Sequence, residues 1–214
     1  MAKPKEPTDR KERNSFLILG NLACLDLVNT EAVFAGEPVD LLQGFGDLTD
    51  WLGETGVVEP PAARSARERW EGKAEAAVAF RQAVTLRTSL RRMVERLSVG
   101  RGATEDQVET INRVLAERPA YRQLVRKGRG FSSTLVPVHE SAMQLLVPVA
   151  ESAAWLLEQG DLSLLRRCEN PRCVLFFYDT TRNGRRRWCS MAGCGSRAKA
   201  AAYYRRSRAA KAGR

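Results

Sequence analysis

The chain has 214 residues, 43% of them hydrophobic, and a formal net charge of +10. This length suits one large or two modest domains, and the hydrophobic content excludes a wholly disordered chain. Fourteen Lys and Arg residues lie between Arg166 and Arg214 against two acidic residues, so this segment carries +12 and residues 1–165 carry −2. A single-sign field of this density predicts a polyanionic partner, most simply nucleic acid or an anionic membrane face.

No run of residues reaches the roughly 18 apolar positions that a membrane-spanning helix needs. Residues 1–14 are charged throughout, unlike a signal peptide. We therefore expect a cytoplasmic protein with no membrane partner. Reducing conditions in that compartment disfavour stable disulfides, which bears on how the cysteines are interpreted.

Residues 1–13 predict a flexible charged arm. The chain then turns apolar, and Leu22, Leu25 and Val28 fall on one face of a helix. Residues 16–19 fit a strand as well as a helix.

A short helix follows, with Asp47 as its candidate N-cap and Gly56 near its end. The segment 59–67, EPPAARSAR, is rich in Pro, Ala and Arg and predicts a mobile loop. After this loop, apolar residues recur at steps of three and four and predict a further helix: Leu86, Leu90, Met93 and Leu97.

Two more helices complete a predicted helical domain over residues 14–160. Thr104 and Gln107 have the spacing of a capping box at the start of the first. Its expected buried stripe is Val108, Ile111 and Leu115. Residues 138–156 continue with helical periodicity, and we expect a kink or break at Pro148.

The character of the sequence changes at residues 161–209, which predict a small separate module, followed by a flexible tail at 210–214. Asp161 can cap a short helix that ends at Arg167. A final helix is expected over residues 197–209.

Between these helices the module predicts a β-hairpin. The run VLFFY at 174–178 is the best strand signal in the sequence. Asn183-Gly184 predicts a type I′ turn, from which the chain returns through Arg186 to Trp188. The fold class is therefore mainly α, with a helical N-terminal domain followed by a small zinc-binding module that contains a β-hairpin and a C-terminal helix.

The zinc prediction rests on two close pairs of cysteines, Cys168 with Cys173 and Cys189 with Cys194. Such pairs bring four thiolates to the corners of a tetrahedron, which predicts one structural Zn²⁺ with no open position for water. Two disulfides, free thiols and an iron–sulfur cluster are the alternatives. Cys24 lies far away on an apolar stripe and is predicted to be a small core residue.

The sequence around these cysteines resembles the CGNR zinc finger, in Phe177, Asp179, Arg182, the run RRWCS at 186–190 and the run CGSR at 194–197. The nonapeptide LACLDLVNT at 22–30, with Asp47-Leu48 and Trp51-Leu52, resembles the ABATE domain that precedes this finger in bacterial proteins. The resemblance implies a bacterial stress-induced transcription regulator whose finger binds DNA.

One residue departs from the signature of this finger, because its Asn is Ser196 here. Ser caps a helix about as well as Asn does. If the Asn amide instead contacts a base or a phosphate, that contact is weakened or lost.

The basic residues of the module allow two interpretations. Arg172, Arg187 and Arg197 can neutralise a tetrathiolate zinc site, whose net charge is about −2. The remaining cations exceed that need and predict contacts with nucleic acid, in which arginine contacts phosphate and tyrosine packs on sugar or base. The predicted contact residues are Arg182, Arg185, Arg186, Arg197, Lys199, Tyr203, Tyr204, Arg205, Arg206 and Arg208.

Composition does not separate DNA from RNA. A finger with a helix of about three turns fits a major groove, whereas a hairpin with aromatic residues serves RNA equally well. The family resemblance favours DNA, and an RNA-binding or protein-interaction protein with the same zinc module is the alternative.

The helical domain shows no phosphate loop, paired-histidine motif or nucleophile elbow, so we expect no enzyme. His139, the only histidine, is expected to be a surface or capping residue. Asp26, Asn29 and Glu31 are either local capping residues or a small recognition set for a ligand between helices. A helical domain fused to such a finger predicts a platform for a small-molecule effector or for homodimerisation.

Overall fold

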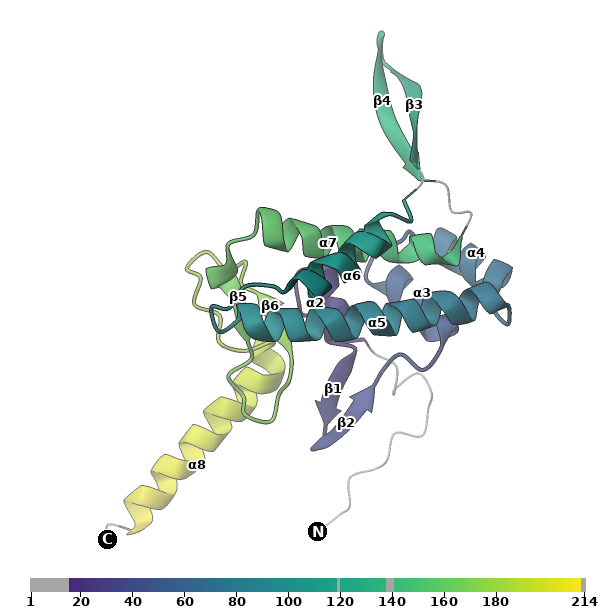
Figure 1. Ribbon diagram of the computed structural model, residues 1–214. Coiled ribbons are helices and arrows are strands. Elements are labelled where there is room, and N and C mark those ends of the chain that lie inside the picture. The colour runs from purple at the N-terminus through teal and green to yellow at the C-terminus, as the bar shows by residue number, and fades with distance from the viewer. Residues whose placement is uncertain (1–15, 119, 138–140, 213–214) are drawn as a thin grey trace.

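The computed structural model describes residues 16–118, 120–137 and 141–212. The predicted arm at 1–13 and His139 lie outside these described residues. Most of the described chain is helical, which confirms the predicted fold class. Figure 1 shows a helical bundle from which two β-hairpins and the C-terminal helix project.

The centre of the bundle is the long helix α5 (Ala74–Leu97). Helices α2 (Ala23–Val28) and α6 (Glu105–Leu115) pack against α5, and α7 (Val147–Glu158) packs against α2 and α6. The face of α5 that is turned to the core carries small and apolar residues at helical spacing, which confirms the predicted helix: Ala79, Ala83, Leu86, Leu90 and Met93. Residues 16–19 belong to neither a helix nor a strand.

Helix α6 begins with the predicted capping box between Thr104 and Gln107. Of the predicted stripe only Ile111 is buried, because Val108 is 38% exposed and Leu115 is half-buried. The other buried positions of α6 are Gln107 and Val114. The break predicted at Pro148 is confirmed. A 3₁₀ turn, η1 (Ala142–Leu146), precedes α7, and Pro148 lies in the first turn of α7, where its missing N–H has no helical partner to lose.

The predicted loop at 59–67 is wrong, because these residues belong to helix α4 (Pro60–Trp70). Two prolines are compatible with the first turn of a helix, and the Ala and Arg residues that follow are good helix formers. The buried residues Ala63, Ala66 and Trp70 recur at steps of three and four, and α4 packs against α3 (Phe45–Glu54). The same helix α3 begins after Gly44, so Asp47 lies in its first turn and is not its N-cap.

The sequence did not predict the two hairpins of the N-terminal domain. Strands β1 (Glu31–Phe34) and β2 (Glu37–Asp40) form the first, and β3 (Ala120–Lys127) and β4 (Gly130–Pro137) form the second. Each hairpin pairs its strands antiparallel, and no third strand joins either of them within the described ranges.

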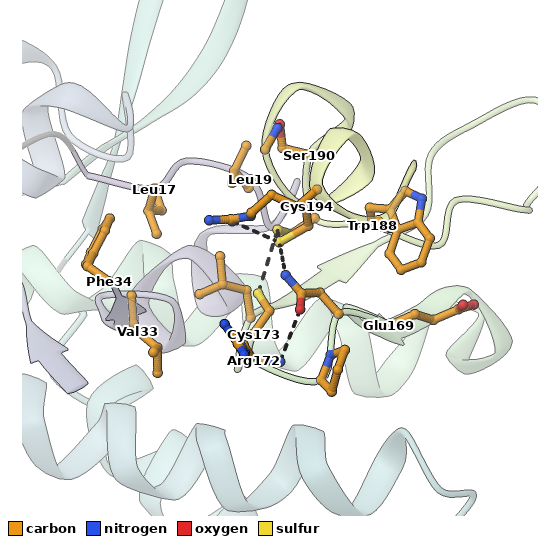
Figure 2. Close-up of a pocket in the computed structure, with 18 of the residues that line it drawn as sticks. Leu17, Leu19, Val33, Phe34, Glu169, Arg172, Cys173, Trp188, Ser190 and Cys194 are labelled. Carbon is orange, nitrogen blue, oxygen red and sulfur yellow. Dashed lines mark hydrogen bonds between the residues drawn. The ribbon is translucent and has the colours of Figure 1, made fainter. Parts of the chain in front are cut away.

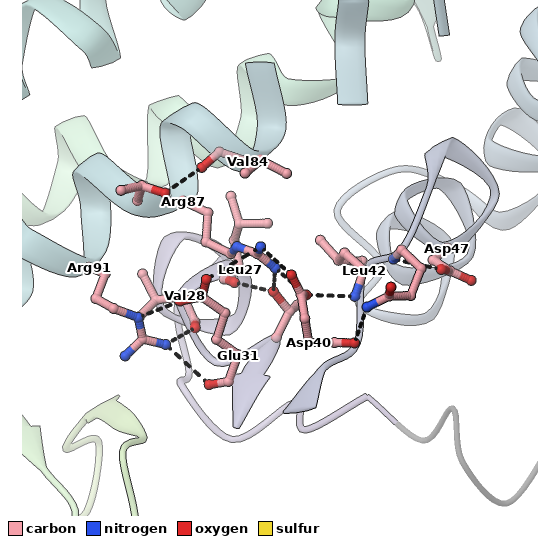
Figure 3. A network of polar contacts seen from close by, with 12 residues as sticks. Leu27, Val28, Glu31, Asp40, Leu42, Asp47, Val84, Arg87 and Arg91 are labelled. Atoms are coloured by element: carbon pink, nitrogen blue, oxygen red, sulfur yellow. Dashed lines mark hydrogen bonds and ion pairs between the residues drawn. The ribbon is translucent and has the colours of Figure 1, made fainter. Parts of the chain in front are cut away.

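A buried arginine fastens the β1–β2 hairpin to α5 (Figure 3). Arg87 is 2% exposed, and its guanidinium donates two hydrogen bonds, of 2.6 and 2.7 Å, to the Asp40 carboxylate. One turn later in α5, Arg91 donates to Glu31 at 2.7 Å and to the Val28 carbonyl at 2.6 Å. Because a buried charge is stable only when it is paired, this network fixes the hairpin at one position on the helix.

The C-terminal module contains its strand pair in another place than predicted. After the 3₁₀ turn η2 (Leu162–Leu164), β5 (Leu165–Arg167) pairs antiparallel with β6 (Phe176–Tyr178). The predicted return strand at Arg186 to Trp188 is wrong, and so is the type I′ turn, since Gly184 has a φ of +58° but Asn183 has no positive φ. The cap at Asp161 is confirmed, because its side chain accepts from the Ser163 N–H. The predicted helical end at Arg167 is wrong, because the 3₁₀ turn ends at Leu164 and the next three residues form β5.

The module ends in a π-helical turn, η3 (Met191–Gly195), followed by α8 (Ser196–Ala212). Helix α8 extends beyond the predicted end at 209, so residues 210–212 of the predicted flexible tail are helical. Within the described residues, no helix is long and apolar enough to cross a bilayer.

Candidate metal centre and nucleic-acid interface

The root of the C-terminal module is built into the core of the helical domain. Leu165, Phe176 and Tyr178 join the same apolar cluster as the helices. Asn29 completes this junction, because its side-chain amide donates to the Phe176 carbonyl at 2.8 Å and accepts from the Phe176 N–H at 2.9 Å. Asn29 is fully buried, so its amide pairs with the edge of β6 in the way that a neighbouring strand would.

Asp26 holds the segment that precedes α2 against the same root. One oxygen of its carboxylate accepts from the N–H groups of Leu19 at 2.9 Å and Gly20 at 2.7 Å. The Gly20 carbonyl in turn accepts from the Tyr178 N–H at 2.8 Å. Gly20 is required there, because a Cβ at this position would lie 2.7 Å from the Cβ of Leu25. Burial raises the pKa of Asp26 to about 6, although the two backbone N–H groups oppose this shift.

The predicted ligand set of Asp26, Asn29 and Glu31 is therefore not an open recognition site. Asn29 does end α2, as the capping alternative predicted, but its amide is used on β6. Glu31 pairs with Arg91 at 2.7 Å and with Arg87 at 3.4 Å. All three side chains hold segments of the protein together.

The four cysteine sulfurs form one compact cluster within the module, and Figure 2 labels two of these cysteines, Cys173 and Cys194. All four Sγ atoms lie within 4.8 Å of one another, and the edges Cys173–Cys189 and Cys189–Cys194 measure 3.8 and 3.6 Å. A tetrahedron of four sulfurs at about 2.3 Å from Zn²⁺ has edges of about 3.8 Å. The cluster therefore fits one zinc ion, and all five cysteines are free of disulfides.

Two tight turns present these sulfurs. In the first, the Cys173 N–H donates to the Asn170 carbonyl at 2.8 Å, and the Asn170 side chain accepts from the Arg172 N–H. In the second, the Ser190 hydroxyl accepts from the Gly193 N–H at 3.2 Å at the start of η3. Gly195 is needed there because a Cβ would lie 2.9 Å from the side chains of Met191 and Trp188.

Hydrogen-bond donors surround the sulfurs as zinc thiolates require. The Asn170 amide donates to Cys194 Sγ at 3.2 Å, Arg197 donates to the same sulfur at 3.3 Å, and the Cys189 N–H donates to Cys168 Sγ at 3.4 Å. Of the three arginines predicted to neutralise the site, only Arg197 touches sulfur. Arg187 instead pairs with Glu169 at 2.6 Å. Asn170 was missed by sequence reasoning, although its position before Pro171 is a turn signal.

The pKa values of Cys168, Cys173 and Cys189 depend on one another. Hydrogen bonds from Cys173 and Cys189 lower the pKa of Cys168, and the same contacts raise the pKa of Cys173 and Cys189 because these two act as donors. Four adjacent thiolates thus need a cation to be held together. By contrast, burial raises the pKa of Cys24 to about 11, which confirms an inert core thiol.

Two side chains that are turned inward, Asp179 and Arg186, hold the loop at 179–186 in place. The buried carboxylate of Asp179 accepts from the N–H groups of Thr181 at 2.9 Å and Arg186 at 2.7 Å. The Arg186 guanidinium lies 4.2 Å over the Phe177 ring and donates to the carbonyls of Leu19, Trp188 and Cys189. Arg186 therefore stabilises the loop and does not belong to the predicted exposed group, whereas Arg182 and Arg185 are exposed.

Among the helices of the described residues, α8 is the one that extends away from the bundle in Figure 1. Apart from Arg197 at its start, its described cations make no ion pair with the described chain. Tyr203 and Tyr204 are 62% and 67% exposed, with ring centroids 5.9 Å apart. The predicted contact residues on this helix are all exposed: Arg197, Lys199, Tyr203, Tyr204, Arg205, Arg206 and Arg208.

A groove of about 940 Å³ lies between the helical domain and the zinc centre (Figure 2). Its apolar wall comes from both sides and includes Leu17, Val33, Phe34 and Trp188. Arg172, Arg197 and Arg205 are its lining cations, and Glu169 is its lining acid. The groove contains none of the predicted ligand residues Asp26, Asn29 and Glu31.

Comparisons with known proteins agree with this division of the chain. Residues 21–160 match the model of the ABATE family, described as "Putative stress-induced transcription regulator", and residues 165–207 match the model of the CGNR zinc finger. A search of curated proteins finds no significant match. Neither family is one of enzymes, and the second identifies the four-cysteine cluster as a structural zinc site. The chain therefore belongs to the ABATE family of transcription regulators and carries a C-terminal CGNR zinc finger.

Proposed function

We propose that this protein is a non-enzymatic cytoplasmic regulator that binds DNA through α8 and the neighbouring loop of the zinc finger. The observation that carries the proposal is the projecting helix α8, whose basic and aromatic side chains are exposed and, apart from Arg197, make no ion pair with the rest of the described chain. A helix of this kind fits the major groove, where arginines contact phosphates and base edges. The zinc centre and the Asn29 junction supply the rigid base from which α8 projects.

Two of the eight cations among the predicted contact residues are used by the protein itself, Arg186 in the interior and Arg197 at the zinc site. Six remain for a partner: Arg182, Arg185, Lys199, Arg205, Arg206 and Arg208. If each neutralises one phosphate, the logarithm of the binding constant falls against the logarithm of salt concentration with a slope of about −5. A slope near zero would show that these cations serve only solvation.

Fluorescence anisotropy with a labelled duplex tests the proposal. The double variant Arg206→Glu/Arg208→Glu should weaken binding at least about tenfold and make the salt slope shallower by about two. The matched control is Arg81→Glu/Arg113→Glu, which changes the net charge equally at two exposed positions of the bundle. Equal losses for the two variants would contradict a local interface on α8. A duplex RNA measured in parallel separates DNA from the RNA alternative, since stronger binding to RNA would overturn the DNA assignment.

We also place the effector site of this regulator in the groove beside the zinc centre. Its volume lies in the range of small-molecule sites. Arg172 and Arg205 line it and have no side-chain partner among the described residues, so an apolar molecule with a carboxylate fits both the wall and the charge. Because Arg205 is also on α8, such a ligand would compete with DNA for the same helix.

The melting temperature in the presence of 2-naphthoate or decanoate tests this site. We expect a rise that the variant Val33→Asp abolishes, since it places a charge in the apolar wall. Val78→Asp, at an exposed position on α5, is the control and should keep the rise. The same response in wild-type protein and Val33→Asp would exclude the groove.

A further inference from the structure

The β3–β4 hairpin is an arm without a partner in the described chain. Its strands pair only with each other, and Figure 1 shows the hairpin standing clear of the bundle. A two-stranded hairpin alone is marginally stable in water. Such an arm gains stability when one of its faces is covered.

One face of the arm is apolar and basic. In the register of the hairpin, Arg122 lies opposite Leu135, Leu124 opposite Ser133, and Arg126 opposite Phe131. Opposed residues and alternate residues of a strand share a face, so these six side chains project together. Leu124, Phe131 and Leu135 are 68%, 63% and 48% exposed. The Arg126 guanidinium lies 5.2 Å over the Phe131 ring.

The other face is less apolar. It carries Gln123 opposite Thr134, Val125 opposite Ser132, Lys127 opposite Gly130, and Val136 in register with Tyr121. Its aliphatic side chains are better covered than those of the first face, because Val125 is 36% exposed and Val136 is half-buried. The surface that requires covering is therefore the face of Leu124, Phe131 and Leu135, here called the apolar-basic face.

The charge of the arm distinguishes between two ways in which a second copy could cover it, with its own arm or with its helical domain. Residues 120–137 contain four cations and no acidic residue, so two hairpins that paired with each other would bring like charges together. The rest of the domain is acidic, since residues 16–119 and 138–165 contain twenty acidic and twelve basic residues, a net charge of −8. A second copy of the chain thus offers the complementary surface.

Helices α6 and α7, which flank the arm in sequence, carry both acidic and exposed apolar residues, to which the apolar-basic face is complementary. Helix α6 carries Glu105, Asp106 and Glu109 against one cation. Helix α7 carries no cation and two acidic residues, of which Glu151 is paired with Arg118 at 2.6 Å and Glu158 makes no ion pair within the described chain. Each helix also exposes one large apolar side chain, because Val108 and Trp155 are both 38% exposed. This surface repels a nucleic-acid backbone, which argues against DNA as the occupant of the adjacent arm.

We propose that the β3–β4 hairpin is a dimerisation arm whose apolar-basic face docks on the acidic surface of α6 and α7 of a second copy. The exchange is reciprocal, since a two-fold dimer uses the same contact twice. The dimer carries two α8 helices and so two DNA-binding elements, but dimerisation does not depend on the proposed DNA binding.

Light scattering coupled to size-exclusion chromatography tests the arm. The 214-residue chain should elute with about twice its own mass of 23.8 kDa. The variant Leu124→Ser/Phe131→Ser/Leu135→Ser should raise the dimer dissociation constant at least about tenfold, because it removes the apolar contacts. The control Gln123→Ser/Thr134→Ser changes the opposite face and should remain dimeric. Unchanged circular dichroism and zinc content show that each variant is folded.

A second variant, Arg122→Glu/Arg126→Glu, keeps the apolar residues and should also give monomers through repulsion by the acidic helices. A monomeric wild-type protein, or a triple-serine variant that stays dimeric, overturns the proposal. Loss of DNA binding by the triple-serine variant without any change in mass would assign the arm to nucleic acid and overturn it as well. The α8 variant Arg206→Glu/Arg208→Glu should stay dimeric, so failure of the DNA proposal is measured separately.

Discussion

The root of the zinc finger and the helix that leaves it contain similar residue types and use them differently. At the root and in the adjoining loop 179–186, the side chains of Asn29, Asp179 and Arg186 are buried or half-buried and bonded to backbone groups of the protein. On α8, Arg206 and Arg208 are exposed and form no ion pair within the described chain. A polar side chain that is already satisfied stabilises the fold, whereas an exposed unpaired one is available to a partner. Function in this molecule is therefore to be sought in the residues that the fold does not use.

Removal of zinc gives the largest expected effect. Chelation should unfold the two cysteine turns and release α8, because structural zinc contributes on the order of 10 kcal/mol to small modules. Strands β5 and β6 should persist, since their apolar residues belong to the core of the helical domain. Elemental analysis should give one zinc per chain, and circular dichroism should lose helix on chelation.

Cysteine variants give the control for this experiment. Cys194→Ser should lose zinc, while Cys24→Ala should retain one equivalent because Cys24 lies in the core, away from the cluster. Folded, zinc-free protein with an intact α8 would contradict the assigned role of the metal.

Asn29→Ala tests the junction between domain and finger. The change leaves the N–H and carbonyl of Phe176 buried without partners, and we expect a loss of about 3 kcal/mol in the free energy of unfolding. Urea unfolding monitored by tryptophan fluorescence measures it. Asn112→Ala, at an exposed position on α6, should change stability by less than about 0.5 kcal/mol. Similar values for the two variants would remove the distinction between used and unused side chains.

The adjacent residues Arg185 and Arg186 allow the same comparison, between an exposed side chain and one bonded within the fold, inside the finger. Arg186→Ala should destabilise the protein by about 2 kcal/mol, because three carbonyl contacts and the stacking on Phe177 are lost. Arg185→Ala should leave the unfolding free energy unchanged and weaken DNA binding. Thermal unfolding measures the stability of both variants, and fluorescence anisotropy measures their DNA binding. A stable Arg186→Ala protein with weakened DNA binding would show that Arg186 contacts DNA and does not stabilise the loop.

The smallest expected effect concerns Asp26 and pH. Its pKa is raised to about 6 by burial, above the value of 3.8 expected without it, so the native state holds this proton more tightly than the unfolded state. The contribution of Asp26 to stability is thus fully present below about pH 4 and is lost as pH rises through 6, by roughly 1–3 kcal/mol.

Asp26→Asn should remove this pH dependence, because an amide oxygen can accept both the Leu19 and the Gly20 N–H bonds without a charge. The test is the difference in unfolding free energy between wild-type and variant protein, measured from pH 4 to 7. Zinc binding also depends on pH, but it does so equally in the two proteins and therefore cancels in this difference. A difference that does not change with pH would show that the buried carboxylate does not titrate in this range.

Local signals in the sequence were enough for the zinc site and for most helices. The cysteine pairs and the capping box of Thr104 with Gln107 act over a few residues, so their spacing is visible in the chain. The helix α4 was missed because prolines at its first turn were interpreted as a loop signal.

Tertiary contacts account for the other errors. The partner of Asn29 lies 147 residues away in the sequence, and no local pattern indicates it. Arg186 follows the turn at Asn183-Gly184, and only the fold shows that its guanidinium is directed inward to Leu19. The β3–β4 hairpin lacks the clean alternation of a half-buried strand because, within the described chain, neither of its faces is covered.

Hydrogen exchange with and without a DNA duplex tests whether the finger binds DNA through α8, since it compares the root, the arm and α8 in one measurement. We expect slower exchange in residues 197–208 and around Arg185 when DNA is bound, with β5, β6 and the β3–β4 hairpin unchanged. Unchanged exchange in α8 together with protection of the helical domain or of the hairpin would contradict it.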